Sequence, residues 1–107
     1  MLELQEQEVM FIKRQATYVY ELPLQTTGDL YVTDQRTVFK SKKVQWLQKE
    51  FIEIRHRDIQ HVQAFDAFHL LPSGLSISLT SGETYRFKLV GREELLRIYA
   101  TLNITSL

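Results

Sequence analysis

The stretch that decides the fold is residues 28–39, which read GDLYVTDQRTVF. In its first half, Leu30 and Val32 point to one side of an extended chain and the residues beside them to the other, as the two-residue period of a β-strand requires. Asp34 then opens a polar turn, because an Asp side chain can accept hydrogen bonds from nearby backbone amides. The chain returns through β-branched and aromatic residues that end at Phe39. The stretch predicts a β-hairpin with a two-residue turn.

The same stretch resembles the signature of the GRAM and bacterial pleckstrin-homology-like domains. In that family a Gly opens a strand of the form G-x-L-x-x-T, and a polar pair, an Arg and x-V/I-F follow. Asp34 stands where the family often has Asn, and the resemblance extends more loosely from about residue 8 to residue 102. The positions that match the signature are Gly28, Leu30, Thr33, Arg36, Val38 and Phe39.

The resemblance implies a mainly β (α+β) fold. The implied architecture is a pleckstrin-homology-like (PH-like) barrel of about seven antiparallel strands in two near-orthogonal sheets, capped by one C-terminal α-helix. It also implies a non-catalytic binding module whose partner is a protein or a membrane surface.

Alternating apolar and polar residues predict further strands outside the hairpin. Within residues 58–68 the apolar side chains change from one side of the predicted strand to the other, which indicates a bulge. Residues 44–47 fit either a strand or one helical turn. The predicted strands are 9–13, 16–22, 51–55, 58–68, 75–80 and 84–89.

The period changes after Gly91, where the sequence predicts a helix that ends near Asn103. A small antiparallel sheet cannot hide its inner face alone, so this helix is expected to pack against it. The apolar positions at i, i+3, i+4 and i+7 of the helix are Leu95, Ile98, Tyr99 and Leu102. Their expected contacts on the sheet are Ile77, Leu79 and Phe87.

The length of 107 residues suits one small domain, which we place over residues 1–107. Residues 1–7 are expected to be a frayed lead-in or a short helical turn. The zero net charge argues against a nucleic-acid binder, and the absence of cysteine excludes disulfides and thiolate metal sites. The longest apolar run, 9–12, is too short to cross a bilayer, and no signal peptide or lipidation pattern is present. These features predict a cytoplasmic protein that meets a membrane only peripherally.

Catalytic chemistry finds no support in the sequence. The histidines at positions 56, 61 and 69 match no metal-binding spacing, and the glycines stand singly at turns rather than in a phosphate-binding loop. We therefore predict no enzyme, no cofactor and no metal site.

Charge is unevenly distributed although its sum is zero. Between Arg36 and Arg57 there are seven cations and two anions, and each cation near an anionic membrane contributes about 1 kcal/mol. The predicted surface for a membrane or a protein partner consists of Lys40, Lys42, Lys43, Trp46 and Lys49. The alternative is a solvated charged face with Trp46 in the core.

The basic motif with which some pleckstrin-homology domains hold phosphoinositides after their first strand is absent. Lys13 and Arg14 are followed by Gln15, so no headgroup site carries over from the resemblance.

A second candidate surface is the apolar loop formed by Phe68, Leu70 and Leu71. Exposed apolar loops mark partner or self-association surfaces. The alternative is that these side chains close one end of the barrel.

Two further functions fit parts of the sequence. Residues 51–87 resemble the start of a LytTR-type DNA-binding domain, but that family continues with another basic strand where this chain is expected to form a helix. The edges of the predicted sheet can also add strands from a second copy, which would build a homo-oligomer.

Overall fold

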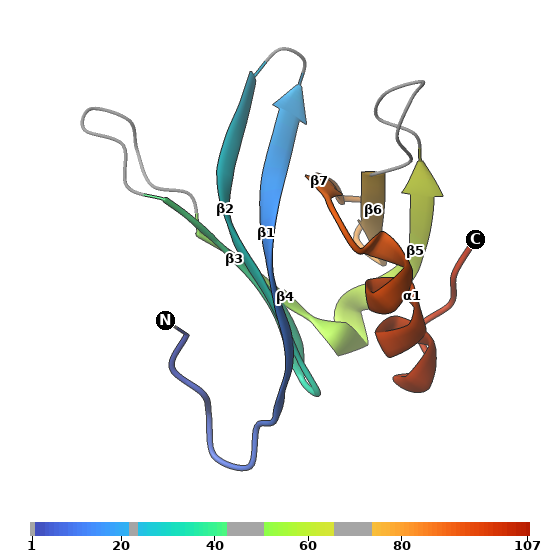
Figure 1. Cartoon of the computed structure of the whole chain (residues 1–107). Helices are drawn as coiled ribbons and strands as arrows, with labels where there is room; N and C mark the ends of the chain where they lie inside the picture. The colour runs from blue at the N-terminus through green and yellow to red at the C-terminus, as the bar shows by residue number, and fades with distance from the viewer. Residues whose placement is uncertain (1, 22–23, 43–50, 66–73) are drawn as a thin grey trace.

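The computed structural model describes residues 2–21, 24–42, 51–65 and 74–107 (Figure 1). These residues contain seven strands, one 3₁₀ helix and one α-helix. In chain order they are β1 (Met10–Glu21), β2 (Leu24–Thr33), β3 (Arg36–Ser41), β4 (Phe51–Arg55), η1 (His56–Asp58), β5 (Ile59–Phe65), β6 (Gly74–Leu79), β7 (Thr84–Leu89) and α1 (Arg92–Thr101).

The strands form one antiparallel sheet in the order β4-β3-β2-β1-β7-β6-β5, which confirms the predicted fold class. The two sheets that we expected are two halves of this single sheet. Figure 1 shows β1–β4 on one side of the molecule and β5–β7 with α1 on the other. The halves are joined at β1, whose residues 16–19 pair with β2 along one edge and with β7 along the other. The sheet is not closed, so β4 and β5 are edge strands.

Several predicted boundaries differ from the observed ones. The strands expected at 9–13 and 16–22 are one strand, β1, with irregular register near each of its ends. The bulge in β5 lies between Ile59 and His61, earlier than the sequence indicated. Residues 66–68, which we assigned to the same strand, and residues 44–47 lie outside the described part of the chain.

The hairpin of β2 and β3 is as predicted, but its turn is held by a different side chain. The Thr33 hydroxyl oxygen accepts hydrogen bonds from the backbone N–H groups of Gln35 and Arg36, each at 3.0 Å. The Asp34 carboxylate instead accepts the backbone N–H of Val9 at 2.9 Å. Thr33 therefore stabilises the turn, and Asp34 fixes the start of β1 beside it.

Near its turn, this hairpin is buried on both faces. The inner side chains Leu30, Val32 and Phe39 belong to the main core. On the outer face, Leu2 covers Tyr31 and Val38, which form a second, smaller core. The expectation that residues 1–7 are frayed is therefore wrong for Leu2, because it supplies the apolar cover that the outer face requires.

The helix docks as predicted. It follows Gly91, whose φ of 84° lies in the left-handed region, and it ends before Asn103, whose φ is 63°. Leu95 and Tyr99 are fully buried in the same cluster as Ile77 and Phe87. The remaining predicted contacts, Ile98, Leu102 and Leu79, are half-buried against that cluster.

The segment after α1 covers part of one sheet edge. Ile104 is buried in the main core, and Ser106 forms a parallel bridge with Val62 of β5. The N–H of Val62 donates to the carbonyl of Thr105, and its carbonyl accepts the N–H of Leu107, both at 2.9 Å. A strand from a second copy would have to displace this segment to pair at Val62.

The signature glycine of the hairpin has a steric role. A Cβ at Gly28 would lie 2.6 Å from the Cα of Ser41 and even closer to the carbonyl oxygen of Lys40, and both are backbone atoms of β3. A side chain at this position would push β2 and β3 apart.

We expect Gly28→Ala to lower the free energy of unfolding by about 2 kcal/mol or more, because backbone atoms of a paired strand cannot move aside cheaply. Urea unfolding measures this change. Gln25→Ala, at an exposed position of the same strand, is the control and is expected to stay within about 0.5 kcal/mol. Equal stability of the two variants would contradict the steric role.

We expect Leu95→Ala to cost about 2–5 kcal/mol, since it removes a fully buried side chain between helix and sheet. Arg97→Ala, at an exposed position of the same helix, is the matched control. A thermal melt in which both variants unfold with the wild type would show that α1 does not contribute to the core.

Candidate binding surface

The structure describes only part of the predicted lipid or partner surface. Lys40 and Lys42 lie at the end of β3, Lys40 half-buried and Lys42 exposed. The other predicted residues of the two candidate surfaces lie outside the described residues: Lys43, Trp46, Lys49, Phe68, Leu70 and Leu71.

The register of the sheet places cations from β3 and β7 on one outer face. Lys88 pairs with Thr17 and Thr17 with Thr27, so these three side chains point to the same side. The N–H of Lys42 donates to the carbonyl of Thr27 at 3.0 Å, which places Lys42 at the next position of the row. One row therefore runs from Lys88 of β7 through Thr17 of β1 and Thr27 of β2 to Lys42, the residue that follows β3.

The neighbouring rows add two more cations. Arg86 pairs with Val19 and is exposed. Lys40 pairs with Asp29 on one side and with Phe51 on the other, and the Phe51 side chain is 58% exposed. We call this surface the basic face and define it by Lys40, Lys42, Arg86 and Lys88, with Thr17 and Thr27 between them.

Sequence reasoning found half of the basic face. Lys40 and Lys42 stand in the cation-rich region of the sequence, whereas Arg86 and Lys88 lie more than forty residues later. The alternation in β7 already indicated that Arg86 and Lys88 point away from the core. The missing information was the pairing of β7 with β1, which no local pattern specifies.

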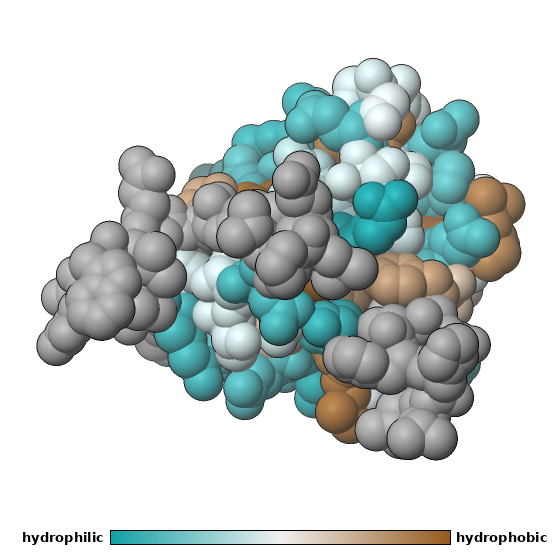
Figure 2. Space-filling view, turned by 90° about the horizontal axis from the view of Figure 1, so that it is seen from above, coloured by the Kyte–Doolittle hydropathy of each residue, from teal (hydrophilic) through white to brown (hydrophobic). Residues whose placement is uncertain are grey.

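Acidic side chains are mostly elsewhere. Among the residues whose side chains are described, Asp29 is the acidic residue of the rows that contain the basic face, and Glu53 on β4 is bound to Arg36. The exposed or half-buried remainder lies in the N-terminal segment, the turns, η1 and α1: Glu3, Glu6, Asp34, Asp58, Glu83, Glu93 and Glu94. The view from above shows a surface that is mostly hydrophilic, with hydrophobic residues in a few separate places (Figure 2).

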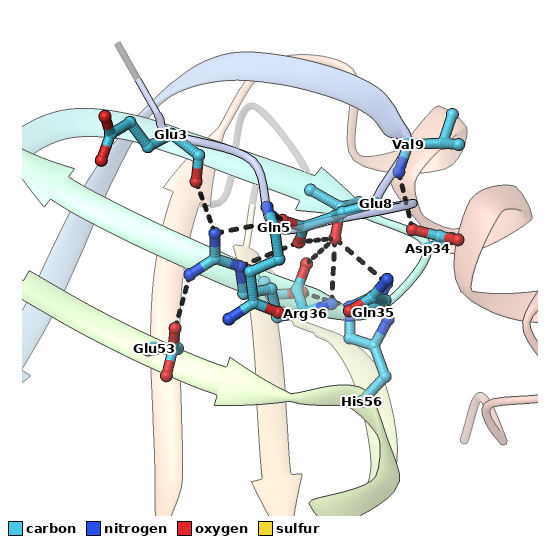
Figure 3. A network of polar contacts seen from close by, with 11 residues as sticks. Glu3, Gln5, Glu8, Val9, Asp34, Gln35, Arg36, Glu53 and His56 are labelled. Carbon is cyan, nitrogen blue, oxygen red and sulfur yellow. Dashed lines mark hydrogen bonds and ion pairs between the residues drawn. The ribbon is translucent and has the colours of Figure 1, made fainter.

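A buried ion pair joins the N-terminal segment to the hairpin (Figure 3). Nε of Arg36 donates to Oε2 of Glu8 at 2.8 Å, and Nη2 donates to Oε1 at 3.1 Å. The hydroxyl of Thr33 donates to the same carboxylate at 2.6 Å. The Arg36 guanidinium and these hydrogen bonds lower the pKa of Glu8 to about 2, although burial opposes the shift.

The remaining donors of Arg36 are also used. Nη1 donates to Glu53 of β4 at 2.6 Å, and Nη2 donates to the carbonyl of Glu3 at 2.8 Å. Arg36 is buried, and Glu8 raises its pKa further. Arg36 therefore links three segments of the chain and is not available to an external anion.

A second polar chain lies between the sheet and α1. The Tyr99 hydroxyl is 2.8 Å from the Thr37 hydroxyl, which is 2.9 Å from Nε2 of His56. Burial lowers the pKa of His56 to about 4, against smaller opposing effects of Asp34. Burial also raises the pKa of Tyr99. Both perturbed groups hydrogen-bond to the Thr37 hydroxyl inside the fold, which gives them a structural role.

The predicted absence of a metal site concerned three histidines. His56 is engaged with Thr37, His61 is half-buried on β5, and His69 lies outside the described residues. Within the described ranges no group of three or more His, Cys, Asp or Glu side chains is placed to hold a metal ion. None of the described helices has the length and apolar character needed to span a membrane.

We expect Glu8→Gln to reduce the free energy of unfolding by about 3–5 kcal/mol, because it leaves the buried Arg36 without its charged partner. Glu6→Gln, two residues earlier and exposed, removes the same charge and is expected to have little effect. Urea unfolding of both variants tests the pair, and equal midpoints would contradict it.

Stability is also expected to fall in two acid ranges. The unfolded chain protonates His56 near its ordinary pKa of 6.5, whereas the native protein resists protonation until about pH 4, so stability falls as the pH drops through that window. Glu8 acts in the same direction between about pH 4.5 and pH 2. Unfolding at a series of pH values should show that His56→Gln flattens only the first range and Glu8→Gln only the second. A variant with an unchanged slope in its own range would refute that assignment.

Comparison with known proteins identifies the family. The family model of the GRAM domain matches residues 1–103. A search of the curated proteins found no match.

Solved structures share the fold at low sequence identity. The C-terminal domain of an unknown protein from Leishmania infantum superposes with a TM-score of 0.75 at 12% identity, over 91% of this chain and 85% of that one. The linker-DH/PH domains of p115-RhoGEF give 0.66 at 8% identity, over 92% of this chain and 29% of that one. The hSac2 domain of the human phosphoinositide phosphatase Sac2 gives 0.63 at 8% identity, over 92% and 70%. The family match and the PH-like sheet with its C-terminal helix lead to one conclusion: this chain belongs to the GRAM domain family.

Proposed function

We propose that this GRAM domain is a non-catalytic binding module that attaches to anionic membrane surfaces. The attachment uses the basic end of β3 and the residues that follow it in the sequence, among them Lys43, Trp46 and Lys49. The observation that carries the proposal is the position of Lys40 on the outer face of β3 and of Lys42 directly after the strand, where its N–H donates to the carbonyl of Thr27. The domain would then be cytoplasmic and peripheral at the membrane.

Two comparisons support a role at membranes. One structural neighbour is a domain of a phosphoinositide phosphatase, and another contains a PH domain. These names describe those proteins, and their identity to this chain is only 8%. They are therefore consistent with the proposal, whose main support is the charge of the end of β3.

The non-catalytic part of the proposal rests on how the buried ionisable groups are used. Glu8 binds Arg36, and His56 and Tyr99 share a hydrogen-bond chain through Thr37. The pKa values of Glu8 and His56 are strongly lowered and that of Tyr99 is raised. Each is held inside the fold by its partners and so has a structural task.

The other functions considered from the sequence have less support. α1 occupies the position at which a LytTR-type domain needs a further basic strand. Strand addition at β5 meets the C-terminal segment already bound to Val62. The loop with Phe68, Leu70 and Leu71 stays a candidate surface for a protein partner, which the experiment below distinguishes from a membrane.

Co-sedimentation with vesicles tests the proposal. We expect binding to vesicles of phosphatidylcholine and phosphatidylserine at low salt, weaker binding at about 0.15 M salt because of screening, and none to phosphatidylcholine alone. The combined variant Lys40→Ala, Lys42→Ala and Lys43→Ala should bind at least tenfold more weakly, since each cation contributes about 1 kcal/mol. Arg57→Ala combined with Arg97→Ala is the control, because it removes exposed cations outside the proposed surface. If the wild type does not bind acidic vesicles even at low salt, the membrane function is excluded and a protein partner is favoured.

A further inference from the structure

We infer that the membrane contact extends over the outer face of the sheet, where Arg86 and Lys88 of β7 join Lys42 in one surface for phospholipid phosphate groups. This inference rests on the proposed membrane function and goes beyond it. It assigns two residues that lie far from the end of β3 in sequence, and it fixes which side of the domain faces the bilayer.

The rigid sheet sets the spacing of these cations. Lys88 and Lys42 stand three strands apart in one row, which corresponds to about 14 Å between their backbones. Arg86 stands two residues from Lys88 along β7, or about 7 Å. Because the strands hold these positions, few backbone degrees of freedom are lost when the face meets a surface.

The two threonines between the cations supply hydrogen bonding. The hydroxyl oxygens of Thr17 and Thr27 are 3.2 Å apart and share one hydrogen bond. Two hydroxyls carry two hydrogens, and their mutual bond uses one of them. The second hydrogen can be donated to a phosphate oxygen held by the cations on either side.

The distribution of charge gives the domain a preferred orientation. Among the described side chains, the rows of the basic face hold four cations and one acidic residue, Asp29, whereas Glu93 and Glu94 lie on α1. Glu3 and Glu6 lie in the N-terminal segment, which packs on the outer face beyond these rows, at Tyr31 and Val38. A negative membrane surface attracts the basic face and repels the acidic first turn of α1. A net charge of zero is compatible with this orientation, because orientation depends on how the charges are separated.

An apolar side chain at the border favours a bilayer over a soluble phosphate compound. Phe51 points outward beside Lys40 and is 58% exposed. At the boundary of headgroups and acyl chains such a side chain can be buried, whereas a soluble phosphate leaves it in water.

The test compares two pairs of substitutions that remove the same charge. Arg86→Gln with Lys88→Gln alters the basic face, and Arg57→Gln with Arg97→Gln alters exposed cations in η1 and α1. The partition coefficient onto phosphatidylserine-containing vesicles is measured at low salt, after thermal melts establish that both variants fold. We expect about 25-fold weaker binding for the first pair, or about fivefold per cation, which corresponds to about 1 kcal/mol each. We expect less than a twofold change for the second pair.

A second measurement locates the contact without relying on charge. The chain has no cysteine, so Gln25→Cys and Arg97→Cys each provide a single attachment point for a fluorophore. Gln25 is exposed and pairs with Val19 in the row of Arg86, whereas Arg97 is exposed on α1. Nitroxide-labelled lipid should quench the fluorophore at position 25 and leave that at position 97 nearly unchanged.

The outcomes separate this inference from the proposed function. If the wild type binds and the variant in Lys40, Lys42 and Lys43 does not, but the β7 pair binds like its control, the basic face is refuted and the basic end of β3 is retained. Equal losses in both pairs, or equal quenching at positions 25 and 97, also refute the oriented face. If the wild type binds no acidic vesicle, the proposed function and this inference both fail.

Discussion

The double pairing of β1 is the constraint on which the rest of the structure depends. Residues 16–19 of this strand hydrogen-bond to β2 on one side and to β7 on the other, so they join the two halves of the sheet. On the inner face at this point, Ala16 lies between Gly28 and Leu89. Small residues allow the strands to approach closely, and a Cβ at Gly28 would meet the backbone of β3. The geometry of the sheet thus explains the signature glycine.

The closely spaced hairpin needs cover on both of its faces, and the two covers are attached by different chemistry. α1 covers the inner face with apolar contacts, and Arg14 of β1 forms an ion pair at 2.5 Å with Glu94 at the start of this helix. The N-terminal segment covers the outer face near the hairpin turn with one apolar residue, Leu2, and with the buried pair of Glu8 and Arg36. A buried ion pair adds little net stability when both charges are removed together, but losing one partner is costly. Its contribution here is to fix where the N-terminal segment lies.

Periodic patterns in the sequence predicted most of the fold. The alternation around Leu30, the change of period after Gly91 and the apolar stripe ending at Leu102 are local signals, and each corresponds to an observed strand or helix. The N-terminal segment could not be predicted in this way. This segment is held in place by the ion pair of Glu8 with Arg36, which lies 28 residues later in the sequence. No periodic pattern of the sequence connects these two positions. The polar sequence of residues 1–7 therefore suggested fraying, whereas one apolar and one acidic side chain are sufficient to anchor it.

The same distinction applies to the candidate binding surface. A cation-rich stretch of sequence identified Lys40 and Lys42, because sequence neighbours on one strand end are also spatial neighbours. Arg86 and Lys88 join them only through the topology, since Thr17 of β1 pairs with β7 and β2 at once. The total composition does not reveal such a surface. A chain with equal numbers of cations and anions can still carry them on different elements of the fold. For a small β domain with zero net charge, the charged residues that strand pairing places side by side are therefore a better guide to a binding surface than the total charge.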